Sequence, residues 1–107
     1  MTGEIIKTKN EYDREERITT SIYVYDTGDI YEYKMEYYKN SRIPAKEFGY
    51  KNGKWYKTVH FDEKGRVVLF EENDNCYTIY TYNENEYNPN HEFHFIDNTL
   101  IHHEAAA

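Results

Sequence analysis

Histidine and carboxylate side chains gather at the C-terminal end of this 107-residue sequence. Four of its five histidines lie in the last 17 residues, among Glu92, Asp97 and Glu104, and these are His91, His94, His102 and His103. Neutral imidazoles and carboxylates ligate Zn²⁺ and similar ions, and two neighbouring strands would bring His94 beside His102 or His103. Adjacent strand residues face opposite sides, so only one of these two can join. The spacing matches no named metal site, so we predict surface or partner-facing histidines and no metal.

Two further arrangements are candidates for catalysis. His60 and Asp62 lie two residues apart, but a general base also needs a substrate pocket and an orienting group, and the sequence indicates neither. A nucleophilic Cys76 would need basic neighbours to stabilise its thiolate, and residues 71–107 contain no Lys or Arg. We therefore predict that the protein is not an enzyme and binds no cofactor.

The charge of the chain is acidic and unevenly distributed. Its 20 acidic and 13 basic residues give a net charge of −7, which repels nucleic acids and anionic membranes. Residues 41–70 carry three acidic and seven basic side chains, whereas residues 71–107 carry eight acidic ones and no Lys or Arg. Adjacent strands could neutralise each other across the sheet, or the acidic segment could form a face that binds a basic partner.

The elements that hold these residues read as β-strands. Residues 55–82 predict three consecutive strands, joined by polar turns at 62–65 and 73–75. Asn52-Gly53, just before them, is typical of a type I′ hairpin turn. In the strand expected over residues 30–38, aromatic and apolar side chains alternate with charged ones, so that one face carries Tyr31, Tyr33, Met35 and Tyr37.

The remaining segments complete an all-β prediction. Strands are expected near residues 5–9, 17–25, 93–96 and 100–103, with a polar loop over 83–90. Residues 11–17 could form a turn of helix, although the β-branched residues after them favour a strand. We predict one β domain over residues 1–107, an antiparallel meander of about seven or eight short strands, forming a single sheet or an open barrel with little helix. The 13 tyrosines supply its apolar packing.

Residues 61–83 resemble one tyrosine-aspartate (YD) repeat, whose pattern is Tyr-Asp-x-x-Gly-Arg-Leu, a later Gly, and Tyr-x-Tyr-Asp. The matching residues are Phe61-Asp62-Glu63-Lys64-Gly65-Arg66-Val67, then Asn75, then Tyr80-Thr81-Tyr82-Asn83. Phe61 replaces Tyr, Asn75 replaces Gly, Asn83 replaces Asp, and Glu86 stands where the repeat closes with Gly. A fainter echo runs from Tyr23 to Ile30. The resemblance implies strand-turn-strand geometry and brings no catalytic residue.

In size and acidity the chain is also similar to bacterial immunity proteins, such as those of contact-dependent growth inhibition. We predict a cytoplasmic, non-enzymatic immunity protein or antitoxin that occludes the active site of a basic toxin, a nuclease. Its predicted partner-binding residues are Glu71, Glu72, Asp74, Tyr80, Tyr82, Glu84 and Glu86. No apolar run is long enough for a signal peptide or a membrane span, and a free edge strand would allow a homodimer. The alternative is a structural or carbohydrate-binding hairpin-repeat module.

Overall fold

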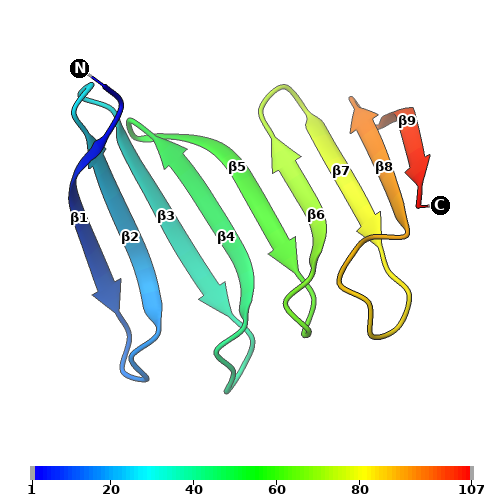
Figure 1. The fold of residues 1–107 in the computed structure, drawn as a ribbon, viewed down its shortest axis with the longest axis horizontal. Helices are drawn as coiled ribbons and strands as arrows, with labels where there is room; N and C mark the ends of the chain where they lie inside the picture. Colours follow the sequence, from blue (N-terminus) through cyan, green and yellow to red (C-terminus); the bar gives the residue numbers. More distant parts are fainter. Residues whose placement is uncertain (1, 107) are drawn as a thin grey trace.

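The computed structural model describes residues 2–106 as one open antiparallel sheet (Figure 1). Strand order across the sheet equals order along the chain, and among the nine strands only consecutive ones contact each other. The strands are β1 (Ile5–Tyr12), β2 (Ile18–Tyr25), β3 (Ile30–Tyr37), β4 (Pro44–Lys51), β5 (Lys54–Phe61), β6 (Val67–Glu72), β7 (Cys76–Thr81), β8 (His91–Ile96) and β9 (Thr99–Ala105).

The all-β class, the antiparallel meander and the single sheet are confirmed, with nine strands instead of seven or eight. Residues 2–106 contain no helix, and therefore no helix that could cross a membrane. The segment that admitted a helical turn instead completes β1 and then turns into β2. The first and last strands are both longer than the sequence suggested, because polar and charged residues continue the ladder at the two edges of the sheet.

Three hairpins share one turn geometry at the upper end of the sheet in Figure 1. Positive φ at two successive residues defines the type I′ turn. These pairs are Asn52-Gly53 (51° and 82°), Asp74-Asn75 (64° and 56°) and Asp97-Asn98 (51° and 64°). In the first and last of them the second strand then carries a bulge, which leaves Tyr56 of β5 and Ile101 of β9 without a cross-strand partner. β5 and β9 therefore both have an unpaired residue at the third position of the strand.

The β5–β6 turn, at the lower end, is organised by Asp62. Its carboxylate accepts hydrogen bonds from the backbone N–H groups of Lys64 and Arg66, at 2.9 and 3.0 Å, and from Arg66 Nε at 2.8 Å. The Arg66 guanidinium lies 4.7 Å from the centroid of the Tyr82 ring, and the Tyr82 hydroxyl donates to the carbonyl of Val67 at 2.5 Å. These contacts join the turn to the end of the next hairpin.

The β1–β2 turn repeats this arrangement with Asp13, Arg17 and Tyr37. The Asp13 carboxylate accepts from two backbone N–H groups of its turn and from Arg17 Nε, at 2.8 to 3.0 Å. Arg17 lies 4.8 Å from the centroid of the Tyr37 ring, and the Tyr37 hydroxyl donates to a carbonyl of β2 at 2.6 Å. Glu16 (φ 63°) takes the left-handed position that Gly65 (φ 82°) has in the other turn. The chain thus contains two equivalent Asp–Arg–Tyr turns.

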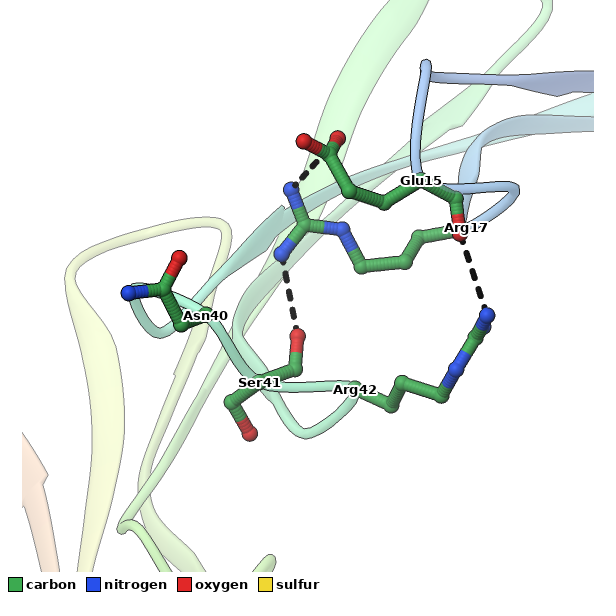
Figure 2. A pocket seen from close by; sticks show the side chains of 5 residues that line it. All are labelled: Glu15, Arg17, Asn40, Ser41 and Arg42. Carbon is green, nitrogen blue, oxygen red and sulfur yellow. Dashed lines mark hydrogen bonds and ion pairs between the residues drawn. The ribbon is translucent and has the colours of Figure 1, made fainter.

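Figure 2 shows how the first of these turns is joined to the β3–β4 turn beside it. One Arg17 nitrogen donates to the carbonyl of Ser41 at 2.9 Å, and Arg42 returns a hydrogen bond to the carbonyl of Glu15 at 3.0 Å. Arg17 also lies 3.5 Å from the Glu15 carboxylate. With Asn40 these residues line a hollow of about 320 Å³. Both guanidinium groups bond to backbone carbonyls there, so the hollow is a junction between turns.

The sheet has two faces, which we name from β3. The tyrosine face carries Tyr31, Tyr33, Met35 and Tyr37, as the alternation predicts, and the opposite face carries Glu32, Lys34 and Glu36. Cross-strand pairing extends the tyrosine face along the row Tyr33, Gly49, Lys57 and Glu72, and along the row Met35, Glu47, Val59, Phe70, Thr78, His94 and His102.

Packing depends on half-buried aromatic rings. Five tyrosines contact one another edge to face on the tyrosine face, with centroids 5.3 to 6.0 Å apart, and these are Tyr23 with Tyr33, Tyr25 with Tyr31, and Tyr31 with Tyr56. The hydroxyls of Tyr33 and Tyr56 are 2.9 Å apart, and the Lys57 ammonium lies over both rings. Within residues 2–106, Val59 is the only buried apolar side chain. Aromatic cross-strand contacts therefore stabilise this sheet in place of a two-sided core.

Candidate functional site

The structure separates the seven predicted partner-binding residues into several places. Glu72 of β6 and Tyr80 of β7 share the tyrosine face, with the Phe70–Thr78 pair between their positions. Glu71 lies on the opposite face, where its Oε1 is 2.5 Å from Nε2 of His60. Asp74 belongs to the upper β6–β7 turn, whereas Glu84 and Glu86 belong to the lower β7–β8 loop (Figure 1). Of the three predicted residues that lie within strands, Glu72 and Tyr80 therefore share one face and Glu71 lies on the other.

Tyr82 is engaged inside the protein. Its ring packs under Arg66 and its hydroxyl bonds to the backbone of β6. Burial raises the pKa of the Tyr82 phenol above 10.0, and the Asp62 carboxylate raises it further. The side chain holds the β5–β6 turn in place, so its contribution to a partner surface is indirect.

Two more acidic residues and two histidines extend the surface around Glu72 and Tyr80. Glu92 of β8 is paired with Tyr80 across the ladder, and Glu104 of β9 is paired with Glu92, so both lie on the tyrosine face in the same row as Tyr80. Burial raises the pKa of the Tyr80 phenol, and the carboxylates of Glu92 and Glu72 raise it further. We call this surface the acidic patch, which consists of Glu72, Tyr80, Glu92, His94, His102 and Glu104.

The histidines of the acidic patch have polar partners on the same face of the sheet. His94 is paired with His102 across the ladder, with ring centroids 5.6 Å apart. The Nδ1 atom of His94 is 3.0 Å from Oγ1 of Thr78, and Nε2 of His102 is 3.0 Å from Oε1 of Glu104. The His102 hydrogen bond holds the pKa of the Glu104 carboxyl below its usual value. Of the two pairings that the sequence admitted, the structure has His94 with His102.

The opposite face of the same strands has a different character. Tyr77 and Phe95 stack with centroids 4.9 Å apart, and Phe93 stacks on His103 at 4.4 Å. His103 therefore lies on the other side of the sheet from His102, as the alternation predicts. The C-terminal end of the sheet thus has one acidic face and one aromatic face.

The residues considered as catalytic candidates do not contact one another, and each has its own local partner. His60 pairs with Glu71 on the opposite face, while Asp62 bonds inside its own turn. Cys76 is half-buried, and its Sγ lies 3.7 Å from the carbonyl oxygen of Asp74. In the part of the chain that the structure describes, no group of three or more His, Cys, Asp or Glu side chains is arranged to hold a metal ion.

No model of a known protein family matches the chain, and no curated protein matches it.

Proposed function

We propose that the protein is a non-enzymatic immunity protein or antitoxin, which acts in the cytoplasm by binding a basic toxin, a nuclease, and covering its active site. A nuclease carries Lys and Arg to hold phosphate groups, so an acidic surface is complementary to its substrate site. The observation that carries the proposal is the position of the acidic patch at one end of an open sheet.

The meander supports this proposal because residues that are close in sequence stay close in the sheet. A segment that is acidic in sequence therefore forms an acidic region of the structure. Strand order equals chain order, so the segment without Lys or Arg forms one end of the sheet, β7 to β9. Lys57 pairs with Glu72 across β5 and β6, but its ammonium lies over the rings of Tyr33 and Tyr56. Among residues 2–106, no salt bridge joins Lys to a carboxylate. Local neutralisation of the acidic end is therefore small.

The acidic patch also contains an anchor for binding. Tyr80 is half-buried among Glu72 and Glu92, and tyrosines at the centre of an interface contribute much of its binding energy. Surface charges mainly increase the association rate, whereas a central aromatic side chain mainly decreases the dissociation rate. The two kinds of residue can therefore be distinguished by kinetics.

The test begins with the product of the neighbouring gene, which this proposal expects to be a basic nuclease. An equimolar amount of this chain should stop that protein from cleaving DNA or RNA. Changing Glu72→Lys and Glu92→Lys together should lower the association rate about tenfold at low salt, and added salt should slow the wild type similarly. Tyr80→Ala should weaken binding by about 2 kcal/mol, chiefly through faster dissociation.

A matched control is a double charge reversal at the other end of the sheet. Glu4 and Glu11 are exposed, and Glu4→Lys with Glu11→Lys changes the net charge by the same amount. This control should leave the association rate within a factor of about two, because exposed charges are screened beyond roughly 8–10 Å. Equal slowing by the two double variants would show that net charge alone matters and that the acidic patch is not the interface.

The two equivalent Asp–Arg–Tyr turns favour a second candidate, a hairpin-repeat module with a structural or carbohydrate-binding role. Repetition of one turn at Asp13 and at Asp62 is expected of a chain built from similar units, and it agrees with the YD-like pattern of residues 61–83. This candidate predicts that the protein binds an oligosaccharide array and leaves nuclease activity unchanged. The immunity proposal predicts the reverse for both measurements.

A further inference from the structure

His91 and His103 form a second histidine pair, outside the acidic patch and on the opposite face of β8 and β9. Nδ1 of His91 lies 2.9 Å from Nε2 of His103, and both side chains are accessible to solvent. The two nitrogens face each other, so one of them must carry the proton that the other accepts. Two ring nitrogens therefore converge on one point from two strands.

In place of the prediction of no metal from sequence, we propose that His91 and His103 bind a divalent transition-metal ion such as Zn²⁺, Ni²⁺ or Cu²⁺. Imidazole nitrogen is a preferred ligand of these metals, with Zn–N distances of about 2.0–2.1 Å. Two such bonds at a tetrahedral angle place the nitrogens about 3.3 Å apart, slightly more than the observed 2.9 Å. Small side-chain rotations supply this difference, and water completes the coordination.

The ring of Phe93 orients this pair. Phe93 stacks on His103 with centroids 4.4 Å apart and planes inclined by 5°, and it lies 5.9 Å from the His91 ring at 27°. Packing against a neighbour restrains an imidazole before a metal arrives, as supporting contacts do in metal sites generally. Binding moves the shared proton to the other nitrogen of its ring, so the step needs no further reactant.

The pair on the tyrosine face lacks this convergence. Nδ1 of His94 is bonded to Thr78, Nε2 of His102 is bonded to Glu104, and the two rings are 5.6 Å apart. Each of these rings is bonded to a residue outside the pair, whereas the nitrogens of His91 and His103 meet each other, so we assign the metal to His91 and His103 alone. His94 and His102 join the same two strands and provide a matched control.

A bound ion would add a second kind of link between β9 and β8. β9 contacts only β8, and every residue of β9 is exposed. Two ligands on different strands would add a cross-link at this edge, and any ligand that binds only the folded state stabilises it.

The experiment uses the full chain without a histidine tag. Titration with zinc chloride, followed by calorimetry, should give one ion per chain, and NMR spectra should show shifts of the His91 and His103 ring protons. Zinc should also slow amide hydrogen exchange in β9. Magnesium chloride should produce none of these changes, because Mg²⁺ prefers oxygen ligands.

His91→Gln and His103→Gln should each raise the zinc dissociation constant about tenfold or more, a loss seen even when outer partners of a metal ligand are removed. The double variant His94→Gln with His102→Gln should bind zinc like the wild type. The proposal is wrong if zinc leaves the wild-type ring protons of His91 and His103 unshifted. It is also wrong if the control variant loses zinc while His91→Gln and His103→Gln retain it.

Discussion

At the scale of single residues, the carboxylate of Asp62 determines the geometry of its turn. It receives three hydrogen bonds, two from backbone N–H groups and one from the side chain of Arg66. Burial acts to raise the pKa of Asp62, but the hydrogen bonds from Arg66 and Lys64 outweigh it and hold the pKa below 3.8. Arg66 in turn reaches the carbonyls of Asn83 and Glu86. Asp62 thus acts on two successive loops through Arg66.

Asp62→Ala should lower the free energy of unfolding by about 2 kcal/mol at pH 7, because hydrogen bonds to a charged group are lost and two backbone donors are left open. Since the pKa of Asp62 is lowered by folding, its contribution is present above pH 3.8 and is lost as the pH falls through the folded-state value. Urea denaturation at pH 7 and at pH 2–3 measures both effects.

Glu63→Ala is the control within the same turn, since Glu63 is exposed. It should change stability by no more than about 0.5 kcal/mol at any pH. An Asp62→Ala deficit that stayed constant down to pH 2 would show that the turn is sensitive to side-chain shape and not to the Asp62 charge.

At the scale of elements, the pairing of β4 with β5 depends on a glycine. A Cβ atom added at Gly49 would lie 2.8 Å from Cγ of Lys57 and 3.1 Å from Cε1 of Tyr56. Both of these side chains cover Gly49, because the bulge at Tyr56 turns two successive residues of β5 toward the tyrosine face. A glycine here costs strand propensity but makes room for the tyrosine cluster.

Gly49→Ala should therefore destabilise the protein by about 1 kcal/mol, since overpacking costs about 1–3 kcal/mol and the gain in strand propensity returns only part of it. In a Lys57→Ala background most of this cost should disappear, because the nearest clashing atom is gone. Thermal unfolding of the four proteins in this double-mutant cycle measures the coupling. Additive effects would mean that Lys57 moves aside freely and that the clash is not limiting.

The hairpins with local turn signals were predictable from sequence, whereas the pairing of their side chains was not. Asn52-Gly53 identified its turn, but the β1–β2 turn was obscured because Glu16 replaces glycine at the left-handed position. From the two-residue turn alone, His94 would face Ile101. The bulge at Ile101 moves this register by one residue and places His102 there instead. A single unpaired residue thus determines which histidines share a face. The residues around Ile101 contain no sequence pattern that predicts this bulge.

At the scale of the whole molecule, the two edges of the sheet differ in charge. β1 carries Lys7 and Lys9, which discourage pairing with another chain, whereas β9 has neither Lys nor Pro. Both edges have an exposed isoleucine without a cross-strand partner, Ile6 in β1 and Ile101 in β9. If edges pair, β9 is the edge that we expect to form an antiparallel homodimer.

Sedimentation velocity should detect this dimer at high protein concentration. Ile101→Lys should shift the equilibrium to monomer, because like charges would meet across a two-fold axis. Ile6→Lys is the matched change at the other edge and should leave the dimer intact. Sedimentation as a monomer at every concentration, or a dimer broken only by Ile6→Lys, would rule out the β9 interface.

The order of the strands also determines how this sheet responds to force. The two ends of the described chain lie at opposite edges of the sheet (Figure 1), and each strand is held only by its neighbours in sequence. Tension between the ends therefore acts across the strands and breaks the hydrogen bonds of one ladder after another, as in opening a zipper. In a sheet that is pulled parallel to its strands, by contrast, all the hydrogen bonds between two strands must break at the same time. An unfolding motor that pulls on either end of this protein meets a series of small barriers.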